Sequence, residues 1–115
     1  MREIHVDLSN DNCSPVVFGG YIGEHNATKV ILKLPHRMLT NDITKYQFVF
    51  KNSENELQLN NLVDTSDINN GNISTMLTES QTTGGCLILS VTAIVEINGV
   101  IIRKAKTPIV SLKVR

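Results

Sequence analysis

The last thirty residues of the chain carry a pattern that only extended strands satisfy. Aliphatic side chains recur at every second position from Leu87 to Ile97, which is the period of a pleated strand. Asn98-Gly99 follows at once, and this dipeptide readily adopts the positive φ angles of a two-residue hairpin turn. The sequence therefore predicts a strand over 86–97, a returning strand over 100–104 and a third strand over 108–114.

Shorter segments upstream show the same alternation. They cover residues 3–8, 16–21, 28–34, 43–51, 56–62 and 73–77. Gly19-Gly20 interrupts the second of these, which indicates a bulge or a close approach of backbone. No segment shows sustained helical periodicity. Seven or eight short strands without crossover helices predict an all-β fold, an antiparallel β-sandwich of the Ig-like kind, in a single domain over residues 1–115.

Composition decides what fills the core of this sandwich. The chain has no Trp and only 4% aromatic residues, so Val, Ile and Leu must supply most of the apolar side chains. Most of the aromatic residues fall on one face of segment 43–51, as Tyr46, Phe48 and Phe50. A row of this kind is expected to face the space between two sheets.

The charge balance argues against two classes of partner. Lys and Arg number 11, Asp and Glu number 11, and the formal net charge is zero. A chain without excess positive charge has no general electrostatic attraction to nucleic acid or to anionic lipid. No apolar run approaches a membrane span, and Met1-Arg2-Glu3 leads into a strand instead of a signal core. We therefore expect no nucleic-acid or membrane partner, and a protein that is made and kept in a cytoplasm.

The sequence offers little for metal or cofactor chemistry. His5, His25 and His36, together with the two cysteines, match no zinc spacing, and His5 is out of phase with the apolar face of its strand. Asp64 and Asp67 lie in an Asn-rich stretch that lacks the order of ligands in an EF-hand. Turn capping by these side chains is the better interpretation. We expect neither a metal nor a cofactor.

Candidate nucleophiles and anion sites are equally weak. No Gly-x-Ser-x-Gly elbow occurs. Cys13 and Cys86 could pair if strands brought them together, but two separate inert thiols in or near the core are favoured. Arg103-Lys104-Ala105-Lys106 fits a solvated strand edge better than an anion site. No catalytic residue is therefore expected, and the chain is not predicted to be an enzyme.

One ordered set of motifs goes beyond general strand and turn patterns. A strand that ends in Leu34-Pro35 precedes an aromatic strand, and a Leu-Thr segment then leads through glycines to a long strand, a hairpin and a final Lys-Thr-Pro step. The matching positions are Leu34-Pro35, Tyr46 to Phe50, Leu77-Thr78, Gly84-Gly85, Asn98-Gly99 and Lys106-Thr107-Pro108. From about Thr28 onward this order resembles the N-terminal domain of phage baseplate upper proteins of Gram-positive hosts, and related tail-fibre proteins. The segment SNDNCSPVVFGG departs from that pattern.

The resemblance implies a structural and non-catalytic role in a phage tail or baseplate. A domain of this family anchors a host-recognition or fibre component to the tail. The implied partners are other tail or baseplate proteins, the implied location is the virion, and the full-length protein is expected to be a homo-oligomer. Because the chain ends at Arg115 directly after a strand, we expect it to be the N-terminal domain of a longer protein.

Two apolar residues fail to fit the buried periods and are candidate interaction residues. These are Met38, in the connection after Pro35, and Ile101, in the returning strand of the last hairpin. Both are predicted to be exposed and to contact a partner.

The alternative function is a carbohydrate-binding or adhesion sandwich. Sugars stack on exposed aromatic rings, and Tyr21 is the residue expected outside the central aromatic row, with Phe18 undecided.

Overall fold

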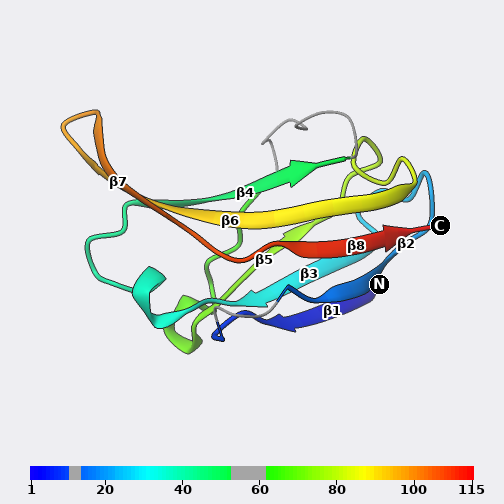
Figure 1. Cartoon of the computed structure of the whole chain (residues 1–115), viewed down its shortest axis with the longest axis horizontal. Helices are drawn as coiled ribbons and strands as arrows, with labels where there is room; N and C mark the ends of the chain where they lie inside the picture. Colours follow the sequence, from blue (N-terminus) through cyan, green and yellow to red (C-terminus); the bar gives the residue numbers. More distant parts are fainter. Residues whose placement is uncertain (11–13, 53–61) are drawn as a thin grey trace.

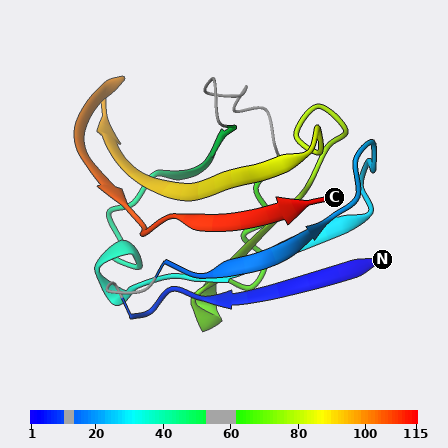
Figure 2. The ribbon, with the colours of Figure 1, turned by 45° about the vertical axis from the view of Figure 1, so that its right-hand side comes forward.

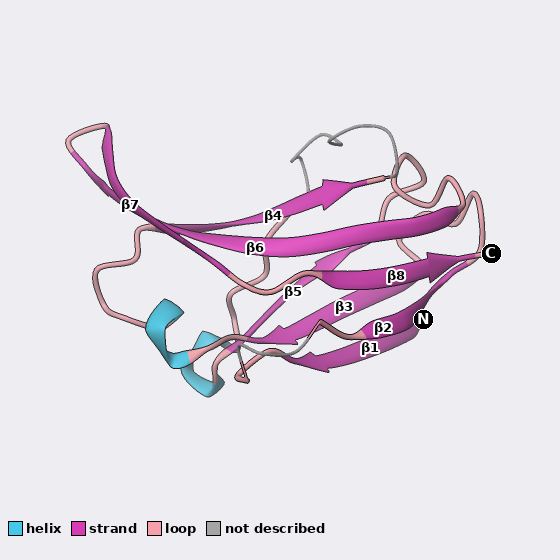
Figure 3. Ribbon diagram, in the orientation of Figure 1, coloured by secondary structure: helices cyan, strands magenta, loops and turns pink. Residues whose placement is uncertain are grey.

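The computed structural model describes residues 1–10, 14–52 and 62–115. These residues form eight strands and two single-turn 3-10 helices, His36–Met38 (η1) and Ile68–Asn70 (η2) (Figures 1 and 3). The strands are β1 (Arg2–Asp7), β2 (Val16–Gly20), β3 (Thr28–Lys33), β4 (Lys45–Lys51), β5 (Asn72–Met76), β6 (Gly85–Ile97), β7 (Val100–Lys106) and β8 (Val110–Val114). The prediction of an all-β sandwich is confirmed.

The smaller sheet has three strands in the order β1-β3-β5. β3 and β5 are antiparallel, whereas β1 and β3 are parallel, which an all-antiparallel arrangement does not include. The reason lies in the connection. Between β1 and β3 the chain passes through β2 in the opposite sheet, so it returns to the first sheet running in its original direction (Figure 2).

The larger sheet has five strands and is built around β6. Its order is β2-β8-β6-β4, with β7 also paired to β6. Along one side β6 pairs with β4 from Ile88 to Ile94. Along the other side it pairs first with β8 and then, beyond Val91, with β7. The edge strand β2 runs parallel to β8, and the remaining pairs are antiparallel.

The core lies between the two sheets and follows the predicted alternation. On β6 the inward residues are buried as far as Val95, and on β4 the rings of Phe48 and Phe50 stack with centroids 6.3 Å apart. The smaller sheet contributes Val30 and Leu32, which are fully buried. Each side chain of this size stabilises the fold by roughly 1.5–3 kcal/mol when it leaves water. The predicted inward row of aromatic residues is confirmed.

The glycine pair in β2 has the predicted effect on the strand. The register against β8 shifts between Phe18 and Gly20, which marks a bulge. A Cβ on Gly19 would lie only 2.9 Å from Cβ of Leu112, so the backbones approach more closely than a side chain would allow.

Two sequence predictions fall wholly or partly outside the described residues. The predicted strand over 56–62 is described only at Leu62, which is exposed and outside any strand. Cys13 is not among the described residues, so its pairing with Cys86 stays untested. Cys86 itself is exposed at the start of β6 and is not a core residue, because its side chain points to the outer face of the sheet.

Candidate functional site

The end of the β6–β7 hairpin extends beyond the rest of the sandwich. We name residues 96–102 the arm, and Figure 1 shows it projecting from the body of the molecule, in orange at the upper left. Its turn is Asn98-Gly99, with φ angles of 53° and 79°. Positive φ at both positions is the geometry of the predicted hairpin turn, which is therefore confirmed.

The base of the arm is fastened to the loop that precedes β4. The Thr44 hydroxyl donates to the Ile94 carbonyl at 2.9 Å and accepts from the Glu96 amide at 3.1 Å. The Arg103 guanidinium donates to Asp42 at 2.7 Å. A hydrogen bond from the Thr40 hydroxyl, together with Arg103, lowers the pKa of the Asp42 carboxyl, so this acceptor is ionised at neutral pH. These contacts, with an ion pair between Lys45 and Glu96, hold the root of the arm.

A bulge lies where the arm leaves the body. Val95 pairs with Arg103 and Glu96 pairs with Ile101, so Ile102 has no partner of its own on β6. An extra residue on one strand bends the ribbon and increases its twist. The bulge accounts for the turn of the arm away from the flat part of the sheet, which Figure 2 shows clearly.

The arm exposes four aliphatic side chains to solvent. The exposed fractions are 54% for Ile97, 61% for Val100, 46% for Ile101 and 58% for Ile102. Ile97 and Val100 are directly opposite each other across the hairpin, so their side chains share one face. Because side chains alternate along β6, this is the same face on which Leu89, Val91 and Ala93 enter the core, nearer the start of the strand. Exposed apolar side chains gathered at one end of a ribbon make the arm a candidate for protein association.

Of the two predicted interaction residues, only Ile101 lies on the arm, on the face opposite to that of Ile97 and Val100. Ile101 is half-exposed on the arm, opposite Glu96. The prediction for Met38 is wrong, because its side chain is 0% exposed and belongs to the core beneath η1. Its carbonyl accepts a hydrogen bond of 2.6 Å from the Tyr46 hydroxyl, which holds the connection against β4. A buried side chain cannot serve as a docking contact.

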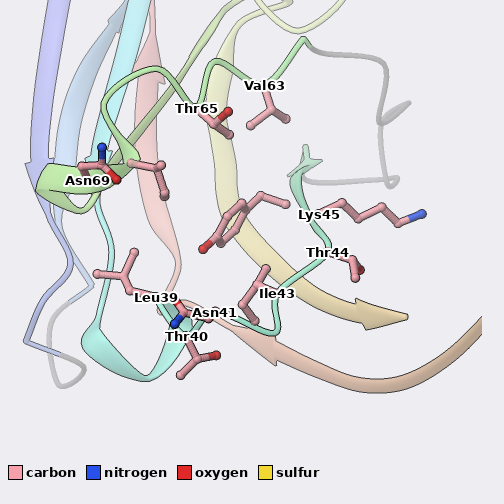
Figure 4. A pocket seen from close by; sticks show the side chains of 11 residues that line it. Leu39, Thr40, Asn41, Ile43, Thr44, Lys45, Val63, Thr65 and Asn69 are labelled. Atoms are coloured by element: carbon pink, nitrogen blue, oxygen red, sulfur yellow. The ribbon is translucent and has the colours of Figure 1, made fainter. Parts of the chain in front are cut away.

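A cleft of about 520 Å³ opens beside the root of the arm. One wall is the loop 39–45 and the other is the segment 63–69 (Figure 4). Leu39 and Ile43 lie on one side of the cleft, and Val63 lies on the other. Ile68 and the ring of Tyr46 add to the apolar lining, and burial raises the pKa of the Tyr46 hydroxyl. The volume falls in the range of sites that accept ligands or side chains.

A second exposed group lies at the opposite end of the sandwich. Phe18 and Tyr21 contact edge to face, with ring centroids 5.2 Å apart. The Arg2 guanidinium lies 5.0 Å from the Phe18 centroid and 5.6 Å from that of Tyr21. It is held there by Glu24 at 2.9 Å and by Thr28 at 2.7 Å. The two aromatic residues considered for sugar binding are therefore brought together, with a cation against their faces.

Among the residues that the structure describes, the candidate metal ligands are not brought together. His5 is exposed as predicted, and the three histidines lie on separate elements. The Asp67 carboxylate accepts from the side chains of Asn70 and Asn72, which is the turn-capping role predicted for it. Within residues 1–10, 14–52 and 62–115, no three His, Cys, Asp or Glu side chains converge as metal ligands.

The comparisons with known proteins bear on the fold. Neither the family models nor the curated proteins give a match to the sequence. Among solved structures, the N-terminal domain of phage TP901-1 ORF48 superposes with a TM-score of 0.69, at 17% sequence identity. The chain has the fold of this phage domain. The match covers 100% of this chain and 99% of that chain, which includes the segment SNDNCSPVVFGG that the sequence motifs left unmatched.

The shared fold confirms the resemblance at the level of architecture. The likeness covers nearly all of both chains and concerns the fold. In the described part of the chain, no helix is both long and apolar enough to span a bilayer.

The sequence predictions missed three of the four exposed residues of the arm. Ile97, Val100 and Ile102 were assigned to ordinary strand positions because they continue an aliphatic pattern. A signal was present in the sequence EINGVII, since the apolar residues run directly up to the turn on both sides. The residues next to a hairpin turn are usually polar, because no second sheet covers that part of the hairpin.

Proposed function

We propose that this chain is a non-catalytic structural module of a phage tail or baseplate, where it anchors a host-recognition or fibre component to the tail. The observation that carries the proposal is the full-length likeness to a domain of a phage protein.

The arm supports a role in assembly. Binding of another surface over the exposed aliphatic residues of the arm would be favourable by about 25 cal/mol per Å² of apolar area removed from water. We assign contacts within the tail assembly to this surface, with Ile101 as the interaction residue retained from the sequence. The proposed setting is the virion, after synthesis in the host cytoplasm, with the chain as the N-terminal unit of a longer homo-oligomeric protein.

The proposal is tested by binding to tail proteins of the same virion. The chain is immobilised and exposed in turn to each purified tail and baseplate protein, with binding followed by interferometry. Saturable binding to at least one distal tail component is expected, and no turnover of model ester, glycoside or phosphate substrates. Failure to bind any of these proteins would contradict the assignment, as would turnover that copurifies with the chain.

A second candidate function follows from the exposed aromatic pair. Phe18 and Tyr21 form an accessible edge-to-face pair, and a ring of this kind can stack against the C–H face of a sugar. Selective binding on a glycan array that is lost in Tyr21→Ala would favour an adhesion module. A blank array would leave Arg2, Glu24 and the two rings with a structural role at the start of β1.

A further inference from the structure

One face of the five-stranded sheet packs on the core, and the other faces away from the smaller sheet. We propose that this outer face binds an acidic surface of a different protein. The inference goes beyond the proposed function, which assigns contacts to the arm and none to the sheet. It rests on the charged and aliphatic side chains that the strand register brings to one side of the sheet.

Lysines dominate the charge of this outer face. The positions that alternate with the inward residues of the five strands include five lysines and one carboxylate, that of Glu96. They leave a net charge of +4 on this face, in a chain whose formal net charge is zero. We name it the basic face, and its lysines are Lys45 and Lys51 on β4, Lys104 and Lys106 on β7, and Lys113 on β8.

Most of these ammonium groups lack an anionic partner within the described residues. Lys45 lies 3.5 Å from Glu96, and the other four lysines form no ion pair with the described part of the chain. In the register Lys45 and Lys104 flank Ile94 on either side, which holds their backbones roughly 10 Å apart. Like charges held this near repel one another, so an anionic surface laid over them would be favourable.

Aliphatic side chains occupy the middle of the basic face, with the lysines toward its two ends. Val49 and Ile88 are half-buried there, whereas Val16 and Ile109 are 60% and 46% exposed. The outward face of an antiparallel sheet is ordinarily polar, because it meets water. An apolar centre with a charged rim is instead the anatomy of a surface that binds another protein.

The outer face of the three-stranded sheet shows no such segregation of charge. Glu3 and Asp7 on β1 lie directly opposite Lys29 and Lys33 on β3, so the charges of these four residues cancel. The excess of positive charge is therefore particular to the larger sheet. The smaller sheet supplies lysines for a matched control.

A second copy of this chain does not match the basic face. Two copies that met through this face would oppose +4 with +4. Elsewhere in the described residues, the carboxylates of Glu24 and Asp42 already contact Arg2 and Arg103 of the same chain. The occupant that fits is thus another protein, with carboxylates around an apolar centre.

Nucleic acid is the other polyanion to be weighed. Among the strand residues of the basic face there is no arginine, the side chain best suited to phosphate and base recognition. The aliphatic centre also has no counterpart on a phosphate backbone. Both observations favour an acidic protein surface.

The test is an NMR titration of the purified chain with short capped peptides. In one peptide Glu alternates with Val, and in a second Lys replaces every Glu. The Glu-Val peptide is expected to bind at low salt and to shift the amide signals of Gln47, Ser90 and Ser111, whereas those of His5 and Ile31 on the smaller sheet stay in place. Added salt should weaken this binding, because it screens the charges, and the Lys-Val peptide should not bind.

Two pairs of substitutions locate the contact. Lys104→Gln with Lys106→Gln removes two charges from the basic face and should weaken binding of the Glu-Val peptide about fivefold. Lys29→Gln with Lys33→Gln makes the same change in net charge on the other sheet and should leave the affinity close to that of the native chain. A Glu-Ser peptide of equal charge should bind more weakly than the Glu-Val peptide, because it offers nothing to the aliphatic centre.

Four results would overturn the proposal. The first is no binding of the Glu-Val peptide at low salt, and the second is a set of shifted amides that lies off the basic face. The third is an affinity that Lys104→Gln with Lys106→Gln leaves unchanged, which would mean solvated lysines only. The fourth is tighter binding of a duplex DNA at the same amides, which would assign the face to nucleic acid. Because no tail protein is present, these outcomes are independent of the binding test for the proposed function.

Discussion

The two halves of β6 have the same sequence pattern and different surroundings. From Leu87 to Val95 every second side chain is buried. At Ile97 the alternation continues, but the side chain is exposed because the hairpin has passed the end of the three-stranded sheet. The comparison teaches that periodicity defines which face of a strand is apolar, and that the topology decides whether anything covers it.

The largest effect should separate the two residues first chosen as interaction sites. Met38→Asp places a charge in the core and should lower the free energy of unfolding by about 3 kcal/mol or more, since a buried carboxylate without a partner is strongly unfavourable. Ile101→Asp on the arm should change it by less than about 0.5 kcal/mol. Urea unfolding followed by circular dichroism measures both. Equal losses would show that the arm belongs to the cooperative core.

A matched pair on β6 tests the comparison within one strand. Leu89→Ala leaves a cavity in the core and should cost about 2–5 kcal/mol. Ile97→Ala removes contacts only from an exposed face and should cost less than about 0.5 kcal/mol. Thermal unfolding of the two variants at low protein concentration, where copies do not associate, gives the difference. A comparable loss in Ile97→Ala would mean that a surface of the same copy covers the arm.

Two glycines with positive φ extend the comparison to the backbone. At Gly20 φ is 115°, and a Cβ there would lie 2.5 Å from Glu24 and 2.7 Å from Arg2. Gly20→Ala should therefore cost about 1–3 kcal/mol of global stability, because it strains the backbone and disturbs an ion pair. At Gly99 an added Cβ would have no neighbour within 4 Å, so Gly99→Ala strains only the backbone of the turn. We expect faster amide exchange in the arm and a smaller change in the unfolding midpoint than for Gly20→Ala. A larger drop in the unfolding midpoint for Gly99→Ala than for Gly20→Ala would contradict this prediction.

The smallest effect concerns the acidic turn beside the cleft. Hydrogen bonds from Asn72 and then Asn70 lower the pKa of Asp67 below its ordinary value. A carboxyl group with a lowered folded pKa contributes stability above its unfolded pKa, and this contribution is lost as pH falls through the folded pKa. Asn72→Ala should move the Asp67 titration midpoint upward, as followed by NMR of the carboxyl carbon. An unchanged midpoint would show that these hydrogen bonds do not form in solution.

Local patterns predicted most of the fold. The Asn98-Gly99 turn, the aromatic row of β4 and the bulge at Gly19-Gly20 each depend on neighbours within a few residues, and each was predicted correctly. The parallel pairing of β1 with β3 could not be predicted in this way. It depends on β2 joining the opposite sheet, which is a choice of partners distant in sequence.

The candidate site was only half predictable, for a related reason. Met38 breaks the strand period, yet a 3-10 turn after Pro35 directs it into the core. Ile97 obeys the period, yet it lies past the edge of the covering sheet. Exposure at these positions depends on where the second sheet ends, which the alternation of apolar residues within each segment does not show.

The contrast between body and arm is tested most directly by amide hydrogen exchange along β6. In dilute protein, the amides of segment 87–93, whose alternate side chains are buried in the core, should be strongly protected. The amides of residues 97–101 should exchange much faster. Protection at residues 97–101 as strong as at 87–93 would contradict the division of β6 into a covered and an uncovered part.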